Sequence, residues 1–310
     1  MCDLTRPEFQ DPEKARAQIE ASRWPNGPFC PHCGGTERIY PVKARKEKKI
    51  RPGLYKCGEK ECGRSFTVTV GTVMESSRVP LNKWLMAIHL MCASKKGYSA
   101  HQLHRTLGVT YKTAWFLAHR IREAMKAPGG IMGSDGGPVE ADETFIGHDK
   151  TKKPKGQKKG RGYEHKHKIV ALVDRRTGKA RSMVVDDLKA STIAPIVQEN
   201  IDREARLMTD EASHYTAIGR EFSEHGVVRH GDGEYGRGDI HTNTIEGFFS
   251  IFKRGMKGVY QHCTKKHLHR YTTEFDFRYS YRQKLGYNDA ERAKIALLGI
   301  EGKRLMYRDS

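Results

Sequence analysis

Two closely spaced cysteine pairs constrain the first part of this chain more than any other feature. Two residues separate Cys30 from Cys33, and four residues separate Cys57 from Cys62. Two such turns bring four thiolates together, and zinc binds four thiolates tetrahedrally in closed structural sites. The surrounding stretch is rich in lysine and has almost no apolar core, so four unligated thiols would leave it without a source of stability. We therefore expect a zinc ribbon with structural Zn²⁺ over residues 26–75.

Charge and hydropathy limit the kind of partner that this chain can have. The formal net charge is +19 and the pI is about 9.6, which favours a polyanionic partner. The longest apolar run, Trp84 to Ala93, has ten residues, whereas a membrane-spanning helix needs ~20. Because we see no basic amphipathic helix or lipidation signal, nucleic acid is favoured over a membrane. An odd set of seven cysteines, in a chain without an apolar signal segment, indicates a reducing, cytoplasmic location.

Breaks in composition divide the chain into segments. A stretch with five glycines and two prolines, residues 127–138, interrupts a helical pattern, and short runs rich in β-branched residues follow it. The segments that we predict are a helical lead over 1–25, the zinc ribbon over 26–75, a helical DNA-binding region over 76–128, an α/β catalytic domain over 129–285 and a C-terminal helix or tail over 286–310.

The pattern over residues 98–125 is typical of a helix-turn-helix. Two stretches with helical periodicity are joined by a short turn that contains glycine, and Ser99 and Thr110 suit the N-caps of the two helices. Lys112 would lie at the start of the second helix, where groove contacts are made, and Arg120 lies further along it. An ordinary αα-hairpin is the alternative, because any two amphipathic helices joined by glycine share this pattern.

The second half of the chain alternates strand and helix patterns. Residues 175–179, RRTGK, suit a hairpin turn, and helices are expected over about 192–201 and from Thr242 onward. Strands are predicted over 138–147, 168–174, 180–187 and 205–211, and a further strand, FTVTV, over 66–70 behind the second cysteine pair.

Three acidic residues stand out from this pattern. Asp142 lies inside the first strand after the linker, Asp210 lies at the end of the fourth, and Glu246 lies on the first turn of the following helix. Acids placed in this way converge in a ribonuclease H-like core, a mixed sheet with flanking helices. Converging carboxylates bind two Mg²⁺ or Mn²⁺ ions, which suits in-line phosphoryl transfer.

Other acids compete for this role, because acids at strand ends are often turn or cap residues. Glu143 follows Asp142 directly and should face the opposite side of the strand. Asp174, Asp186 and Asp187 lie at predicted strand ends.

The segment around and after Glu246 suits a DNA-binding surface. An apolar stripe lies beside the acid on the predicted helix, and residues 253–270 contain six Lys and Arg and no acid. His262, Cys263 and His267 suit either a second metal cluster or, as the alternative, a basic loop. The lysine-rich stretch 149–168 is a further candidate DNA contact. The single residues that we expect to contact DNA here are Asn243, Lys253, Arg254, Lys257, Lys265 and Lys266.

As a set, these motifs resemble bacterial insertion-sequence transposases of the DDE type that carry an N-terminal zinc ribbon, a group related to the Merlin superfamily. The resemblance implies a ribonuclease H-like domain behind a DNA-binding region, with Mg²⁺-dependent cleavage of transposon ends and strand transfer into target DNA. It assigns the catalytic triad to Asp142, Asp210 and Glu246. Phe249 departs from the family, which usually has Trp there. The segments that carry the resemblance are 23–35, 55–84, 139–147, 207–215 and 241–279.

Two alternatives to a transposase share these motifs. One is a domesticated or regulatory zinc-ribbon DNA-binding protein with an inactive core, and the other is a nuclease that cuts without joining. For a transposase, the expected partners are double-stranded inverted-repeat ends and target DNA. Two ends must be joined to one target, so a homodimer or larger assembly on DNA, associated with the nucleoid, is expected.

Overall fold

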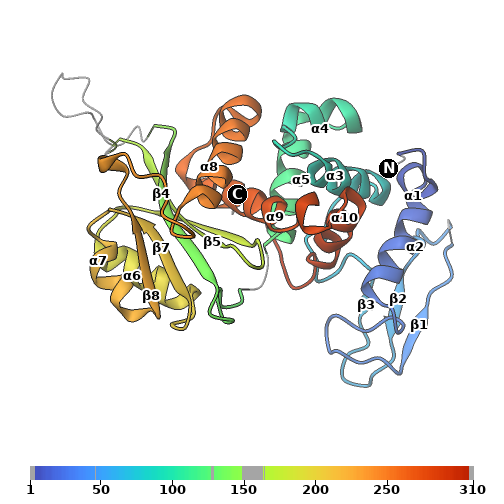
Figure 1. Cartoon of the computed structure of the whole chain (residues 1–310). Helices are drawn as coiled ribbons and strands as arrows, with labels where there is room; N and C mark the ends of the chain where they lie inside the picture. The colour runs from blue at the N-terminus through green and yellow to red at the C-terminus, as the bar shows by residue number, and fades with distance from the viewer. Residues whose placement is uncertain (1–3, 46, 127–128, 149–162, 164, 307–310) are drawn as a thin grey trace. The chain divides into compact units, whose positions relative to one another are not determined.

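The computed structural model describes residues 4–45, 47–126, 129–148, 163 and 165–306 (Figure 1). The chain forms two compact units, and each is described by itself. The first unit comprises residues 1–94, 98–126 and 288–310, and the second comprises residues 95–97 and 127–287.

The zinc ribbon of the first unit is a small antiparallel sheet in the order β1-β2-β3, with helices α1 and α2 before it. One face of the sheet packs against Trp24, whose ring meets Tyr55 and Phe66 edge-on with centroids 5.4 and 6.0 Å apart. The elements are α1 (Pro7–Gln10), α2 (Pro12–Arg23), β1 (Ile39–Pro41), β2 (Tyr55–Cys57) and β3 (Ser65–Phe66).

The predicted strand FTVTV was wrong beyond its first residue, because β3 ends at Phe66. The chain then turns, with Val70 N donating to Thr67 O at 3.0 Å. Val68 is fully buried, so its apolar side chain enters the core from a turn instead of a strand. Arg23 fixes this turn by donating to the carbonyls of Val68 and Val70.

The rest of the first unit is helical. The Ser99 side chain accepts from Gln102 N in a capping box, the Thr110 side chain accepts from Thr113 N, and both N-cap predictions are confirmed. The turn between α4 and α5 uses Gly108 at φ 58, a left-handed conformation that favours glycine. The helices are α3 (Leu81–Ala93), α4 (Ala100–Leu107), α5 (Tyr111–Ala124) and α10 (Asp289–Leu298), and α10 packs on α3.

The second unit is a five-stranded mixed sheet in the order β6-β5-β4-β7-β8. β4, β5 and β6 are antiparallel neighbours, while β4, β7 and β8 run parallel. This arrangement matches the ribonuclease H-like fold that we expected. The strands are β4 (Pro138–Ile146), β5 (His167–Asp174), β6 (Ala180–Val185), β7 (Arg206–Asp210) and β8 (Glu224–Val228).

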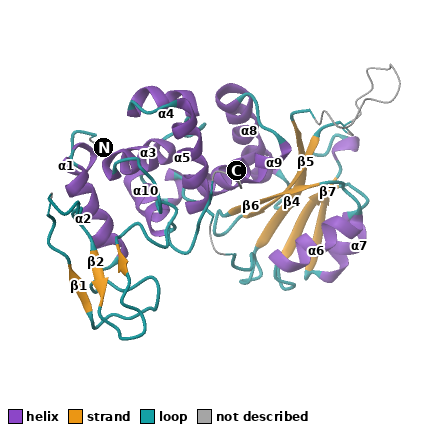
Figure 2. Cartoon of the chain, turned by 180° about the vertical axis from the view of Figure 1, so that it is seen from behind, coloured by secondary structure: helices purple, strands orange, loops and turns teal. Residues whose placement is uncertain are grey.

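Helices cover both faces of this sheet (Figure 2). Val139 and Ala141 of β4 belong to the core under α6 and α7, whereas Ile146 belongs to the core under α8 and α9. The helices are α6 (Ala190–Asn200), α7 (Tyr215–Ile218), α8 (Asn243–Gly255) and α9 (Lys265–Ser280), with a π-helical turn at Met256–Tyr260 and 3₁₀ turns at Gly219–Glu221, His230–Asp232 and Gln283–Leu285.

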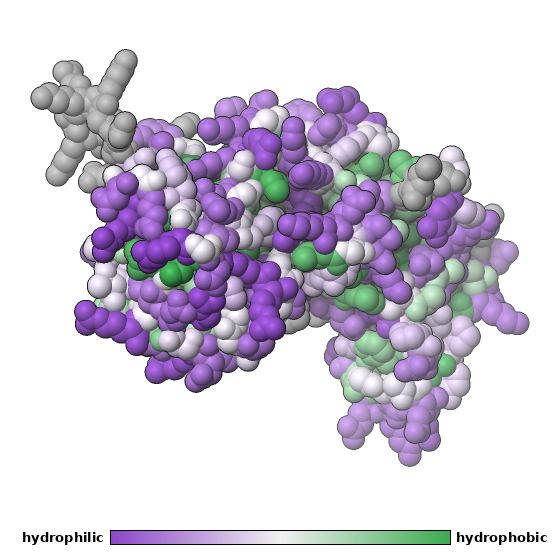
Figure 3. Space-filling model, viewed as in Figure 1, coloured by the Kyte–Doolittle hydropathy of each residue, from purple (hydrophilic) through white to green (hydrophobic). Residues whose placement is uncertain are grey.

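The surface in Figure 3 is mostly hydrophilic, with hydrophobic side chains in small separate patches. Within the described residues, no helix has both the length and the apolar character needed to span a bilayer.

Candidate functional site

Asp142 and Asp210 lie on neighbouring parallel strands of the second unit. β4 pairs with β7 in a register that sets Glu140 beside Met208. The paired residues end there, and Asp142 and Asp210, the last residue of β7, each lie two residues beyond this last pair. Because the two strands run in the same direction, Asp142, inside β4, and Asp210, at the end of β7, both lie on the carboxyl side of the paired residues.

Burial and charge shift the pKa values of these acids. The pKa of Asp142 is raised to about 8, and burial is the largest cause. Three neighbouring carboxylates act in the same direction, those of Glu143, Asp210 and Glu246. The pKa of Asp210 is also raised, chiefly by burial. The four carboxylates therefore lie in one electrostatic neighbourhood, which we call the acidic site.

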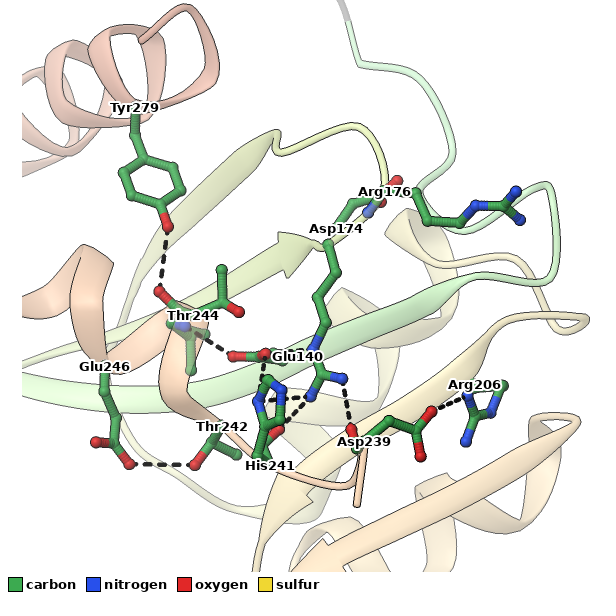
Figure 4. A network of polar contacts seen from close by, with 12 residues as sticks. Glu140, Asp174, Arg176, Arg206, Asp239, His241, Thr242, Thr244, Glu246 and Tyr279 are labelled. Carbon is green, nitrogen blue, oxygen red and sulfur yellow. Dashed lines mark hydrogen bonds and ion pairs between the residues drawn. The ribbon is translucent and has the colours of Figure 1, made fainter. Parts of the chain in front are cut away.

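Glu246 reaches this site from the first turn of α8, with a side chain that is 49% exposed. Thr242 Oγ1 donates to Glu246 Oε1 at 3.2 Å (Figure 4), and His230 Nε2 lies 3.5 Å from the same oxygen. Two side chains that precede α8 therefore orient the carboxylate, while half of its surface stays open to a ligand.

Glu143 is buried on the opposite face of β4, as the alternation of the strand predicted. His214 Nε2 lies 2.8 Å from Glu143 Oε1, and the Tyr215 hydroxyl donates to the same oxygen. Burial is the largest single effect on the pKa of His214 and lowers it, but the hydrogen bond with Glu143 and the charges of Glu143 and Asp210 together raise the pKa. Glu143 lies in segment 139–147, and His214 and Tyr215 lie in segment 207–215, but no spacing rule predicted that their side chains would meet.

Glu140 is the second acid that sequence reasoning missed. It lies two residues before Asp142 on β4, is fully buried, and accepts a hydrogen bond from Ile245 N at the start of α8. Its only sequence signal was an acidic residue in a strand that is otherwise apolar.

The residues that we expected to contact DNA differ in their surroundings. Lys253 is half-buried, and burial lowers its pKa against the opposing effect of the Asp142 carboxylate. Its Nζ lies 6.0 Å from the centre of the Phe249 ring, which is buried. Lys265 pairs with Asp186. The remaining expected contacts in this unit are all exposed: Asn243, Arg254, Lys257 and Lys266.

In the first unit, Lys112 is exposed near the start of α5, whereas Arg120 is 5% exposed. Arg120 donates to the Glu75 carbonyl, and its guanidinium lies 5.6 and 5.3 Å from the ring centres of Trp84 and Phe116. The Arg120 side chain is therefore packed inside this unit. Its burial contradicts our interpretation of Arg120 as a DNA contact.

Two further predictions concern histidines and lysines. Among the described residues, His262, Cys263 and His267 do not form a metal-binding group. Most of the basic stretch 149–168 lies outside the described residues, so its interpretation is neither supported nor contradicted.

The four cysteines of the zinc ribbon come together as predicted. Their sulfur atoms all lie within 4.8 Å of one another, and no other group of histidine, cysteine or acidic side chains among the described residues comes this close together, the carboxylates of Asp142, Asp210 and Glu246 included. Cys30 and Cys62 are 3.7 Å apart at sulfur, as are Cys33 and Cys57. Tetrahedral zinc with Zn–S bonds of ~2.3 Å requires sulfur separations of about 3.8 Å. The cluster therefore fits structural zinc.

Comparison with known proteins agrees with these observations. The model of the ISXO2-like transposase domain matches residues 135–280, and that of the transposase zinc-ribbon domain matches residues 10–65. The chain is 30% identical to an uncharacterized protein in transposable element ISH50 of Halobacterium salinarum, over 286 residues that cover 87% of this chain and 91% of that relative. The chain therefore belongs to the ISXO2-like transposases of insertion elements that carry an N-terminal zinc ribbon.

Proposed function

We propose that this transposase cleaves transposon ends and joins them to target DNA by two-metal phosphoryl transfer, with Asp142, Asp210 and Glu246 as the catalytic, metal-binding residues. The observation that carries the proposal is the acidic site itself. The carboxylates of Glu143, Asp210 and Glu246 add to the effect of burial in raising the pKa of Asp142 to about 8, and a cation bound among them would offset their mutual repulsion. An all-oxygen donor set suits Mg²⁺ or Mn²⁺.

When bound, these ions would supply Lewis-acid stabilisation of an in-line displacement at phosphorus. Asp142 and Asp210 would hold them from the sheet, and Glu246 from α8. Thr242 and His230 orient the Glu246 carboxylate through one oxygen. Lys253, which interacts electrostatically with Asp142, is suited to hold a phosphate next to the acidic site.

The partner that we propose is double-stranded DNA, both transposon ends and target, which places the protein on the nucleoid in the cytoplasm. The zinc ribbon and the α4–α5 helix-turn-helix would bind the ends, with Lys112 at the groove. Exposed cations of α8 and α9 would hold DNA beside the acidic site. We further propose a homodimer or larger assembly on DNA, because two ends must be processed together. The five predicted segments stand as the proposed domain boundaries.

A strand-transfer assay tests this proposal. The full chain is mixed with a labelled inverted-repeat duplex, a target plasmid, and either Mg²⁺ or EDTA, with Glu246→Gln beside the wild type. Joined products that require both Mg²⁺ and Glu246 are expected. Nicking without joining would indicate a plain nuclease, and binding without either would indicate a DNA-binding protein with an inactive core.

A further inference from the structure

Glu140 is a buried carboxylate directly below the acidic site. It lies on β4 two residues before Asp142, so the two side chains share a face of the strand, and Glu140 is 0% exposed. A buried carboxylate is costly unless hydrogen bonds and charge satisfy it. Glu140 Oε2 accepts from Ile245 N at 2.7 Å, and Oε1 accepts from Arg175 Nε at 2.5 Å. The two oxygens of Glu140 therefore accept hydrogen bonds from two different segments of the chain, the start of α8 and the turn after β5.

Arg175 binds the segment that leads into α8. From the turn after β5, its Nη1 donates to Asp239 O at 2.5 Å. Its Nη2 donates to His241 O and lies 3.0 Å from His241 Nδ1. A planar guanidinium that bonds a carboxylate and two backbone carbonyls leaves this segment little freedom.

A second arginine fixes the same segment from β7. Arg206 bonds the Asp239 carboxylate at 2.5 Å (Figure 4). It also bonds the Glu224 carboxylate at 2.5 Å. From the other side, the Tyr279 hydroxyl donates to Thr244 O at 3.2 Å. The start of α8 is therefore held on both sides, by the sheet and by α9.

These contacts end next to the catalytic acid of the helix. Ile245, whose N–H binds Glu140, directly precedes Glu246, and Thr242 of the held segment donates to Glu246 Oε1. Glu140 thus connects the strand that carries Asp142 to the helix turn that carries Glu246 through one side chain.

We propose that Glu140 and Arg175 are positioning residues that set Glu246 against Asp142 and thereby determine the divalent-cation affinity of the acidic site. This inference rests on the proposed function. An ion pair that only stabilises the fold would contribute to the free energy of unfolding without changing metal affinity.

Glu140→Gln in the full chain tests the proposal, because an amide has one acceptor oxygen and can serve either Ile245 or Arg175 but not both. Mn²⁺ affinity is measured from the electron paramagnetic resonance of the free ion, and folding from circular dichroism. We expect Mn²⁺ binding about 10- to 100-fold weaker, the range for partners that orient metal ligands. In the joining assay, we expect a lower rate with an unchanged KM for DNA.

Glu274→Gln is the matched control. Glu274 is also 0% exposed, and it pairs with Arg278 at 2.6 Å within α9. We expect Glu274→Gln to lower stability and leave Mn²⁺ affinity unchanged. Arg175→Lys provides a second variant if Glu140→Gln does not fold, because lysine keeps the charge but lacks the guanidinium fork.

The outcomes separate this inference from the proposed function. If Asp142→Asn abolishes Mn²⁺ binding but folded Glu140→Gln and Arg175→Lys bind as the wild type does, the positioning role is wrong and the function stands. If the wild type itself binds no Mn²⁺ that depends on Asp142, both the proposed function and this inference are overturned.

Discussion

Glu140 Oε2 on β4 lies 2.7 Å from the backbone nitrogen of Ile245, the residue before Glu246. The bond joins the strand that contributes Asp142 to the helix that contributes Glu246. Asp210 needs no such link, because β7 runs parallel to β4 as its direct neighbour and carries Asp210 two residues beyond the last paired residue. Two different devices, strand register and a buried ion pair, therefore assemble the acidic site.

The raised pKa of Asp142 predicts how the metal-free protein responds to pH. The Asp142 carboxyl, whose pKa is raised from an ordinary value of 3.8 to about 8, binds its proton more tightly in the folded state. The contribution of Asp142 to the free energy of unfolding should therefore be fully present below about pH 4, fall as the pH rises from 4 to 8, and be lost above about pH 8. Asp142→Asn should flatten this decline, and saturating Mg²⁺ should oppose it. Thermal melts from pH 4 to 9 check the prediction, and a steeper decline in Asp142→Asn would contradict it.

Removing one zinc ligand should unfold the ribbon. Cys57→Ser leaves three sulfurs, and because the zinc-binding free energy of small modules contributes directly to their folding, we expect a loss of several kcal/mol. Zinc content and the melting curve of the full chain provide the measurement. Cys263→Ser, a half-buried cysteine outside the cluster, is the control and should retain one zinc. Equal zinc in both variants would rule out the four-cysteine site.

Arg120 and Lys112 should respond in opposite ways to alanine substitution. Arg120→Ala removes a buried guanidinium and its carbonyl bond, so stability should fall by about 1–3 kcal/mol with the salt dependence of DNA binding unchanged. Lys112→Ala should leave stability unchanged and reduce the slope of log Kd against log salt by about 0.9. Denaturant melts and DNA titrations at several salt concentrations distinguish the two, and a salt slope that changes with Arg120→Ala would show that Arg120 meets DNA after all.

Two glycines of α8 provide a test of its packing. A Cβ at Gly247 meets no atom within 4 Å, so Gly247→Ala should stabilise the helix by about 0.5–1 kcal/mol. A Cβ at Gly255 would lie 2.5 Å from the Lys96 carbonyl oxygen, so Gly255→Ala should destabilise the protein by about 1–3 kcal/mol. Urea unfolding of both variants checks the difference, and a neutral Gly255→Ala would mean that this close approach does not exist.

Much of the second unit could be predicted because its strands have local signals. The runs that became β4, β5 and β6 contain β-branched residues and are followed by an acid or a turn, and RLMTD, which became β7, is an apolar run that ends in an acid. β8 was missed, because EHGVV begins with two polar residues and a glycine and therefore has no apolar run of strand length. α9 was missed because its buried face includes Arg270, Glu274 and Arg278, and these charged residues, of which Glu274 and Arg278 pair with each other, break the apolar periodicity.

The residues of the acidic site also differ in whether the sequence could predict them. Asp142, Asp210 and Glu246 could be selected from strand and helix positions together with a family resemblance. Glu140 could not, since its role depends on contacts with Arg175 and Ile245 that are distant in the sequence. Arg120 was misread because helical periodicity does not show which face of α5 is covered by other elements.

A crystal of the full chain soaked in Mn²⁺ tests the central claim most directly, because anomalous scattering locates the ion without reference to activity. We predict anomalous peaks coordinated by Asp142, Asp210 and Glu246, lost in Asp142→Asn. Crystals with zinc at the four cysteines but no Mn²⁺ at these three acids would contradict the account.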